Sequence, residues 1–308
     1  MNNWAQLEPV TAEALSVPRR RTVWWQAAAL LALVAWLYAS IISHLVLQWW
    51  NDPDFSHGFL VPAFSLFVLW HSRARLLRLT PTASVWGLFV LAFSLFVLVV
   101  GVLGAELFLS RISLLLLIAG LILLFLGKRY FRAVLFPLCF LVLMIPIPAI
   151  VFNQITFPLQ ILASRLAAVA LPWLGVPVLR EGNIIYLPAM TLEVAEACSG
   201  IRSLLSLVTI AIIYGYLVSS RKSTRILLAL AAVPIAIAAN SLRIIATGLL
   251  VEYWNPSMGE GFLHVFSGWL VFFAALGMLF LVRQVLTGKS PKSPRHGLRT
   301  FVESRERA

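Results

Sequence analysis

The chain has 308 residues, of which 61% are hydrophobic and only 12% are charged, and its mean hydropathy is +0.92. A soluble globular domain is close to half apolar and a quarter charged, so this composition excludes that class. The formal net charge of +12 lies in short clusters between apolar runs. Such clusters are typical of cytoplasmic loops and do not favour nucleic-acid binding. The sequence therefore predicts an all-α polytopic membrane protein.

In chain order, the apolar stretches predict about eight transmembrane helices, because a helix needs roughly 20 residues to cross a bilayer. The predicted spans are Val23–Leu47, Phe59–Trp70, Trp86–Leu103, Ile112–Leu126, Ala133–Val151, Ile201–Val218, Ile226–Val251 and Phe262–Val282. The first is too long for a removable signal sequence. The second and fourth are short, and Pro62 and Arg111 weaken them.

The basic clusters predict how the chain is oriented in the membrane, because cytoplasmic loops are rich in Lys and Arg. They lie at residues 19–21, 71–78, 127–132 and 219–225 and in the tail, which places both termini in the cytoplasm. The loops alternate correctly only if residues 157–175 do not cross, so we expect an interfacial or re-entrant helix there.

Residues 176–194 alternate in character, are rich in β-branched side chains and have a turn near residues 181–183, so they predict a small outer β-hairpin. The chain then divides into a cytoplasmic segment at 1–22, a transmembrane domain at 23–286 and a basic cytoplasmic tail at 287–308. The composition of this tail is typical of disorder.

Scarce charges gather around one of only two cysteines, in "EVAEACSGIRSLLSL" at residues 193–207. At about 1.5 Å per helical residue, Arg243 lies about 27 Å from the cytoplasmic Arg225, and His264 lies about 28 Å from Arg283. Cys198 comes 23 residues before Arg221, at the outer start of its predicted helix. Three separate spans are therefore expected to bring a thiol, a guanidinium and an imidazole to the outer surface.

These residue types suit acyl transfer. A cysteine at a helix N-terminus is favoured as thiolate, and Ser199 can cap that helix. His264 fits a general acid or base, and Arg243 fits a stabiliser of the oxyanion or thiolate. Asn240 lies one turn before Arg243, where its amide could support the guanidinium or a substrate carbonyl. An ion pair of Arg243 with Glu193 or Glu196 remains a structural alternative.

Four motifs, in order, resemble the exosortase/archaeosortase family, and most closely its Gram-negative exosortase branch. They are "DFSHGFLVP" (54–62), "REGNIIYLP" with "LEVAEACSGIRSLLSL" (180–207), "PIAIAANSLRIIATGLL" (234–250) and "GFLHVFSGWLVF" (261–272). The resemblance implies Cys198 as nucleophile, Arg243 as transition-state stabiliser and His264 as acid/base. We expect Asn240, Glu196, Ser199, Asp54 and His57 to bind substrate or support the site, with Asp54 and His57 shaping an outer vestibule.

The resemblance also implies the substrate: exported proteins with a C-terminal sorting signal, made of a Pro-Glu-Pro-like motif, a transmembrane helix and a basic end. A thioester acyl-enzyme would pass the protein to an unknown acceptor, in the bacterial inner membrane and on its periplasmic face. No cofactor or metal is expected, because Cys198, His264, His57 and Asp54 lack the close spacing of zinc ligands.

Two other functions compete with this prediction. A purely hydrolytic cysteine protease would use the same residues, and a transporter could use Arg243 to bind an anionic solute. No repeated half or matched pair of Gly/Pro-broken helices favours a transporter. Cys139, in an apolar run without charged neighbours, is expected to be a small apolar filler.

Overall fold

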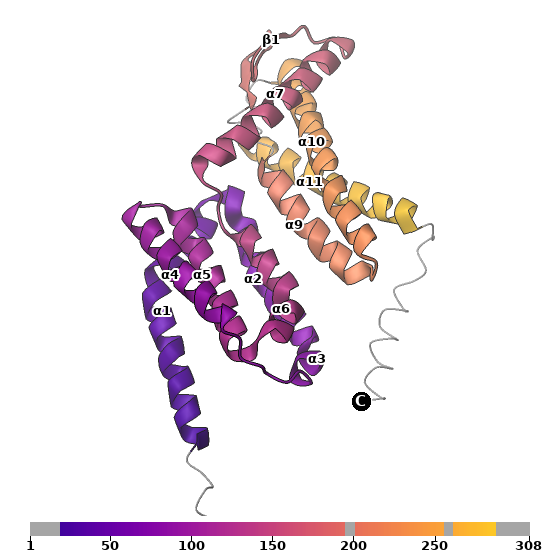
Figure 1. Cartoon of the computed structure of the whole chain (residues 1–308). Coiled ribbons are helices and arrows are strands. Elements are labelled where there is room, and N and C mark those ends of the chain that lie inside the picture. The colour runs from indigo at the N-terminus through magenta and orange to yellow at the C-terminus, as the bar shows by residue number, and fades with distance from the viewer. Residues whose placement is uncertain (1–18, 195–200, 256–260, 288–308) are drawn as a thin grey trace, which may run out of the picture. The chain divides into compact units, whose positions relative to one another are not determined.

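The computed structural model describes residues 19–194, 201–255 and 261–287 (Figure 1). Its internal contacts divide the chain into two units, residues 1–45 and residues 46–308. The first described helix, α1 (Arg19–Asn51), begins in the first unit and ends in the second. Its segment Trp24–Asn51 is long and apolar enough to cross a membrane.

The second unit is built mostly of helices. Its first half contains a 3₁₀ segment and five α-helices, η2 (Pro53–Phe59), α2 (Leu60–His71), α3 (Arg73–Leu77), α4 (Trp86–Leu103), α5 (Leu107–Leu121) and α6 (Lys128–Phe140). A π-helical turn, η3 (Ile122–Leu126), ends α5, and a 3₁₀ turn, η4 (Leu141–Met144), follows α6. The second half contains α7 (Ala149–Trp173), α9 (Ile201–Val218), α10 (Lys222–Tyr253) and α11 (Gly261–Thr287).

Small residues allow α4 and α5 to approach closely. A Cβ at Gly101 would lie 2.6 Å from Ser110 Oγ, and one at Gly120 would lie 2.9 Å from the backbone nitrogen of Leu91. Association of helices in lipid relies on such close backbone packing, because lipid tails are as apolar as leucine. Figure 1 shows the two helices running side by side.

The predicted β-hairpin is confirmed, and a third strand extends it, while its position on the outer face stays a prediction. Strands β1 (Leu179–Glu181), β2 (Ile184–Tyr186) and β3 (Thr191–Glu193) form an antiparallel sheet in the order β1-β2-β3. Gly182 has a φ of +62°, which suits the turn between β1 and β2. Buried side chains of the sheet join a cluster with α7 and α10, formed by residues that include Ile185, Leu192, Val194, Ala167, Leu171 and Val251.

A second apolar cluster joins α9, α10 and α11. Its buried members are small or branched aliphatic residues, namely Leu207, Ala211, Leu228, Ala232, Ile235, Ala236, Ala239, Ala275 and Leu279. Each of the three helices contacts the other two. The alanines of α10 bring the backbones of its neighbours close, in the manner typical of membrane helices.

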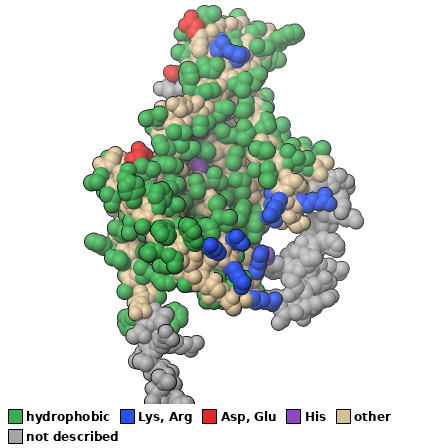
Figure 2. Space-filling view, in the orientation of Figure 1, with side chains coloured by type: hydrophobic (Ala, Val, Ile, Leu, Met, Phe, Trp, Pro, Cys, Tyr) green, Lys and Arg blue, Asp and Glu red, His purple; other side chains and the backbone are tan. Residues whose placement is uncertain are grey.

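The all-α polytopic fold class is confirmed. Six described helices are long and apolar enough to cross a membrane, Trp24–Asn51, Trp86–Leu103, Leu107–Leu126, Ala149–Trp173, Lys222–Tyr253 and Gly268–Leu286, and Arg202–Val218 in α9 is a shorter apolar helix. Figure 2 shows hydrophobic side chains over most of the visible face, and many large ones are exposed. Apolar exposure of this extent is expected of a surface that faces lipid.

One predicted span is wrong. The stretch Ala133–Val151 was expected to be a single helix, but α6 ends at Phe140, η4 follows, and α7 begins at Ala149. The reason is the sequence "MIPIP", because proline removes a backbone donor and the residue before it avoids the helical region. Residues 157–175 fall mostly within α7, whose length and composition allow a crossing, so an interfacial or re-entrant position for them stays a prediction.

Candidate active site

Three helices that carry or adjoin the predicted catalytic residues pack against one another. Helix α9 begins three residues after Cys198, α10 contains Arg243, and α11 contains position 264. All three pairs of these helices are in contact. Sequence spacing predicted a common depth for the three residues but not that their helices are neighbours. The fold shows that these helices are neighbours.

Arg243 reaches across the interface from α10 to α11. A Cβ at Gly268 would lie 3.2 Å from Arg243 Nη2 and 3.3 Å from its Cζ, so the guanidinium rests directly on this glycine. Gly268 follows His264 by four residues in α11, which is about one helical turn, or about 6 Å along the axis. The fold thus brings the guanidinium to the turn of α11 next to His264.

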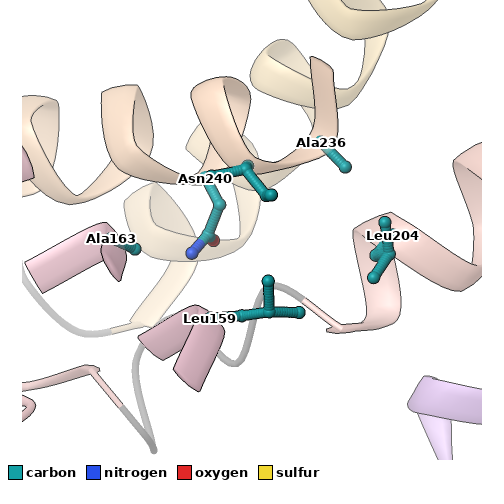
Figure 3. Close-up of a pocket in the computed structure, with 6 residues that line it drawn as sticks. Leu159, Ala163, Leu204, Ala236 and Asn240 are labelled. Carbon is teal, nitrogen blue, oxygen red and sulfur yellow. The ribbon is translucent and has the colours of Figure 1, made fainter. Parts of the chain in front are cut away.

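Asn240 lies one turn before Arg243 on α10 and is buried. It lines a small hollow among three helices, together with Leu159 and Ala163 of α7, Leu204 of α9, and Ala236 and Ile237 of α10. Figure 3 shows the Asn240 amide pointing into this hollow, toward α7. The wall is otherwise apolar, so the amide is its polar group.

Segment η2, which contains Asp54 and His57, and the last turn of α1 before it both contact η4. Trp49 Nε1 donates to the Met144 carbonyl at 2.9 Å, and His57 Nε2 lies 3.3 Å from the Leu143 carbonyl. A carbonyl can only accept, so this contact requires the proton on Nε2. A Cβ at Gly58 would overlap the Trp49 indole, which explains why a glycine follows His57.

The environment of His57 favours a neutral ring. Burial lowers the pKa of the His57 imidazole from its ordinary value of 6.5, and hydrogen bonds to the backbone of Leu143 and Asp54 partly offset this shift. A ring that is neutral and whose Nε2–H faces the Leu143 carbonyl suits an anchoring group better than a general acid, which must carry a second proton before it acts. This is consistent with the supporting role expected for His57.

Asp54 forms an ion pair with a residue near the cysteine motif. Arg202 Nε donates to Asp54 Oδ1 at 2.8 Å, and the two residues are 148 positions apart in the chain. Arg202 is the second residue of α9 and follows Cys198 by four residues. The contact therefore joins the first motif, "DFSHGF", to the helix that follows the cysteine.

Several predicted site residues lie outside the described residues. Cys198, Glu196 and Ser199 belong to residues 195–200, and for His264 the backbone is described as helical but its side chain is not described. Their predicted roles, and the alternative pairing of Arg243 with Glu193 or Glu196, stay predictions. Cys139 is exposed on the last turn of α6.

Sequence reasoning missed two contacts of this site. Arg202 lies in the charged stretch at residues 193–207, but no role was predicted for it. In an apolar chain, an arginine beside a cysteine motif can pair with an aspartate in a distant loop. Gly268 was also missed. The sequence does indicate it, because Gly268 follows His264 by four residues and so places a residue without a side chain on the next turn of the helix.

One protein-family model matches most of the chain. Residues 49–281 match the family described as Transmembrane exosortase (Exosortase_EpsH). No curated protein and no solved structure gave a match. The match covers η2 through most of α11, including all the motifs above, and more than half of the chain. The chain therefore belongs to the transmembrane exosortase family.

Family membership supports a general activity. The family comprises membrane-embedded cysteine peptidases and transpeptidases that process exported proteins. Together with the apolar helices, it makes this chain a multi-pass membrane protein.

Replacing Gly268 should displace the Arg243 guanidinium. The Cβ that Gly268→Val introduces would press on the guanidinium, which must shift by a few tenths of an ångström, and the two methyl groups need further room. We expect substrate processing to fall by about tenfold or more, because small misplacements of groups in an active site can have effects of this size. Gly277→Val is the matched control, because a Cβ at Gly277 meets nothing within 4 Å. The measurement is processing of a tagged substrate at equal membrane levels and equal thermal stability in detergent. Wild-type processing by Gly268→Val would show that the position of Arg243 on this glycine is unimportant.

Proposed function

We propose that this protein is a membrane cysteine protease and transpeptidase that cleaves the C-terminal sorting signal of exported proteins and transfers them to an acceptor. The observation that carries the proposal is the mutual packing of α9, α10 and α11, with the Arg243 guanidinium seated on Gly268 beside position 264. Membership of the transmembrane exosortase family supports the reaction class.

The proposed reaction is acyl transfer in two steps. In the first, the Cys198 thiolate attacks the scissile carbonyl, and Arg243 stabilises the negative charge that develops on its oxygen. The C–N bond then breaks, and the leaving amine takes a proton from His264. In the second step, an acceptor nucleophile attacks the thioester and loses its proton to His264, which releases the thiolate and the new acyl product.

The remaining polar residues are proposed to support the site. Asn240 would do so from the small hollow that Leu159 and Leu204 also line, which has room for about one water molecule. Ser199 would cap the helix that begins after Cys198, and Glu196 would balance the charge of the arginines near it.

The active site is proposed to face the periplasm, with both termini in the cytoplasm. The support is charge asymmetry: basic residues cluster at α3, at the start of α6 and between α9 and α10, and Figure 2 shows most Lys and Arg toward the lower part of the visible face. In a chain whose Cys139 and Cys198 are replaced by alanine, Asn183→Cys, in the turn between β1 and β2, should react with an impermeant maleimide added outside spheroplasts. If labelling requires permeabilised membranes, the turn faces the cytoplasm and the proposed orientation is wrong.

The catalytic roles can be tested by replacing each residue of the proposed trio. Cys198→Ala should abolish processing of a tagged substrate, and Cys198→Ser should be nearly as inactive because a hydroxyl ionises far less readily than a thiol. Arg243→Lys should be severely impaired, since an ammonium lacks the planar fork of guanidinium donors. His264→Ala should lose about 10²–10⁴-fold, the usual value of a general acid.

The control is the other cysteine. Cys139→Ala should process substrate at the wild-type rate, because Cys139 lies exposed on α6 and no polar contact of its thiol is seen among the described residues. Wild-type processing by Cys198→Ala, or loss of processing in Cys139→Ala alone, would show that Cys198 is not the nucleophile. The mass of the new C-terminus distinguishes transfer from simple hydrolysis, which would leave a free carboxylate.

A further inference from the structure

We infer that Arg202 is a positioning residue for Cys198 and that it acts through its ion pair with Asp54. The inference rests on the proposed function, in which Cys198 is the nucleophile. Its starting point is the 2.8 Å contact between Arg202 Nε and Asp54 Oδ1, four residues downstream of the cysteine. Arg202 occupies the first turn of α9, so the contact holds the end of that helix which leads back to Cys198.

The loop side of the contact is a packed segment. The backbone nitrogen of Asp54 donates to Asp52 Oδ1 at 3.0 Å, which caps η2. Phe55 is buried, and its ring centroid lies 5.8 Å from that of Phe152 in α7. These contacts pack the backbone around Asp54 against α7. The first turn of α9 is therefore tied to a packed part of the fold.

The ion pair also bears on how Arg202 acts. An arginine close to a cysteine in sequence is an obvious candidate to favour the thiolate. The guanidinium of Arg202 instead faces a carboxylate at 2.8 Å, which offsets its charge. Arg202 is therefore inferred to contribute geometry and not charge.

The exposure of the pair makes this role testable. The side chain of Arg202 is 55% exposed and that of Asp54 is 23% exposed. Exposed ion pairs contribute little to folding stability. Variants that break the pair should therefore fold and reach the membrane, so that a change in rate can be assigned to the position of the cysteine.

The first arm of the test is a double-mutant cycle on processing. Asp54→Asn and Arg202→Gln should each lower kcat about tenfold, with KM changed by less than about twofold, because the nucleophile is misplaced after the substrate has bound. The double variant should also lose about tenfold, since either change alone removes the whole contact. Arg202→Lys should recover part of the rate, and Arg221→Gln, at an exposed arginine beyond the other end of α9, should match wild type.

The second arm needs no substrate and separates position from charge. It measures the rate of Cys198 alkylation by iodoacetamide against pH, in membranes of a Cys139→Ala background. If Arg202 acts by position, Asp54→Asn and Arg202→Gln should shift the midpoint of this profile in the same direction. If Arg202 acts by charge, the shifts should be opposite, because one variant releases the cation and the other removes it.

The outcomes separate the inference from the proposed function. Additive losses of about a hundredfold in the double variant, wild-type kcat in either single variant, or alkylation shifts of opposite sign would each overturn the positioning role. Shifts in the same direction, in a protein that processes no substrate, would instead support the coupling of Arg202 to Cys198 and contradict the proposed function alone.

Discussion

Close packing of α9, α10 and α11 is the constraint on which the candidate active site depends. The three helices meet through alanines and leucines such as Ala232, Ala236 and Leu279, and Arg243 of α10 reaches α11 across this apolar contact. In lipid the polar groups must find partners inside the protein, because water does not reach them there. Small residues let the helices approach until the guanidinium of Arg243 rests on Gly268, where a side chain would displace it.

Polar contacts then join distant parts of the chain to this cluster. Asp54 belongs to η2, which contacts η4 through His57 and α7 through Phe55, and its carboxylate meets Arg202 at the first turn of α9. The first motif of the family thus lies beside the helix that follows the cysteine motif, although 148 residues separate Asp54 from Arg202. Specific placement, more than stability, is what an exposed ion pair of this kind can contribute.

Much of the fold follows from the sequence because its signals are local. Apolar length predicted most helices, and alternation with a glycine turn predicted the hairpin that β1 and β2 form. The break between α6 and α7 was missed because two prolines outweighed an otherwise continuous apolar run. Contacts between elements were harder: the pairing of Arg202 with Asp54 and the seat of Arg243 on Gly268 depend on helix rotation and lateral order, which hydropathy does not specify.

The most direct test of the central claim is to trap the covalent intermediate. Purified protein would be mixed with a tagged substrate and quenched in acid, and the peptide that contains Cys198 would be weighed. An acyl transferase that works through this thiol should carry the tagged part of the substrate on Cys198, in a linkage that hydroxylamine removes, as expected of a thioester. Turnover of the substrate while Cys198 stays unmodified, or an adduct on any other residue, would contradict the mechanism.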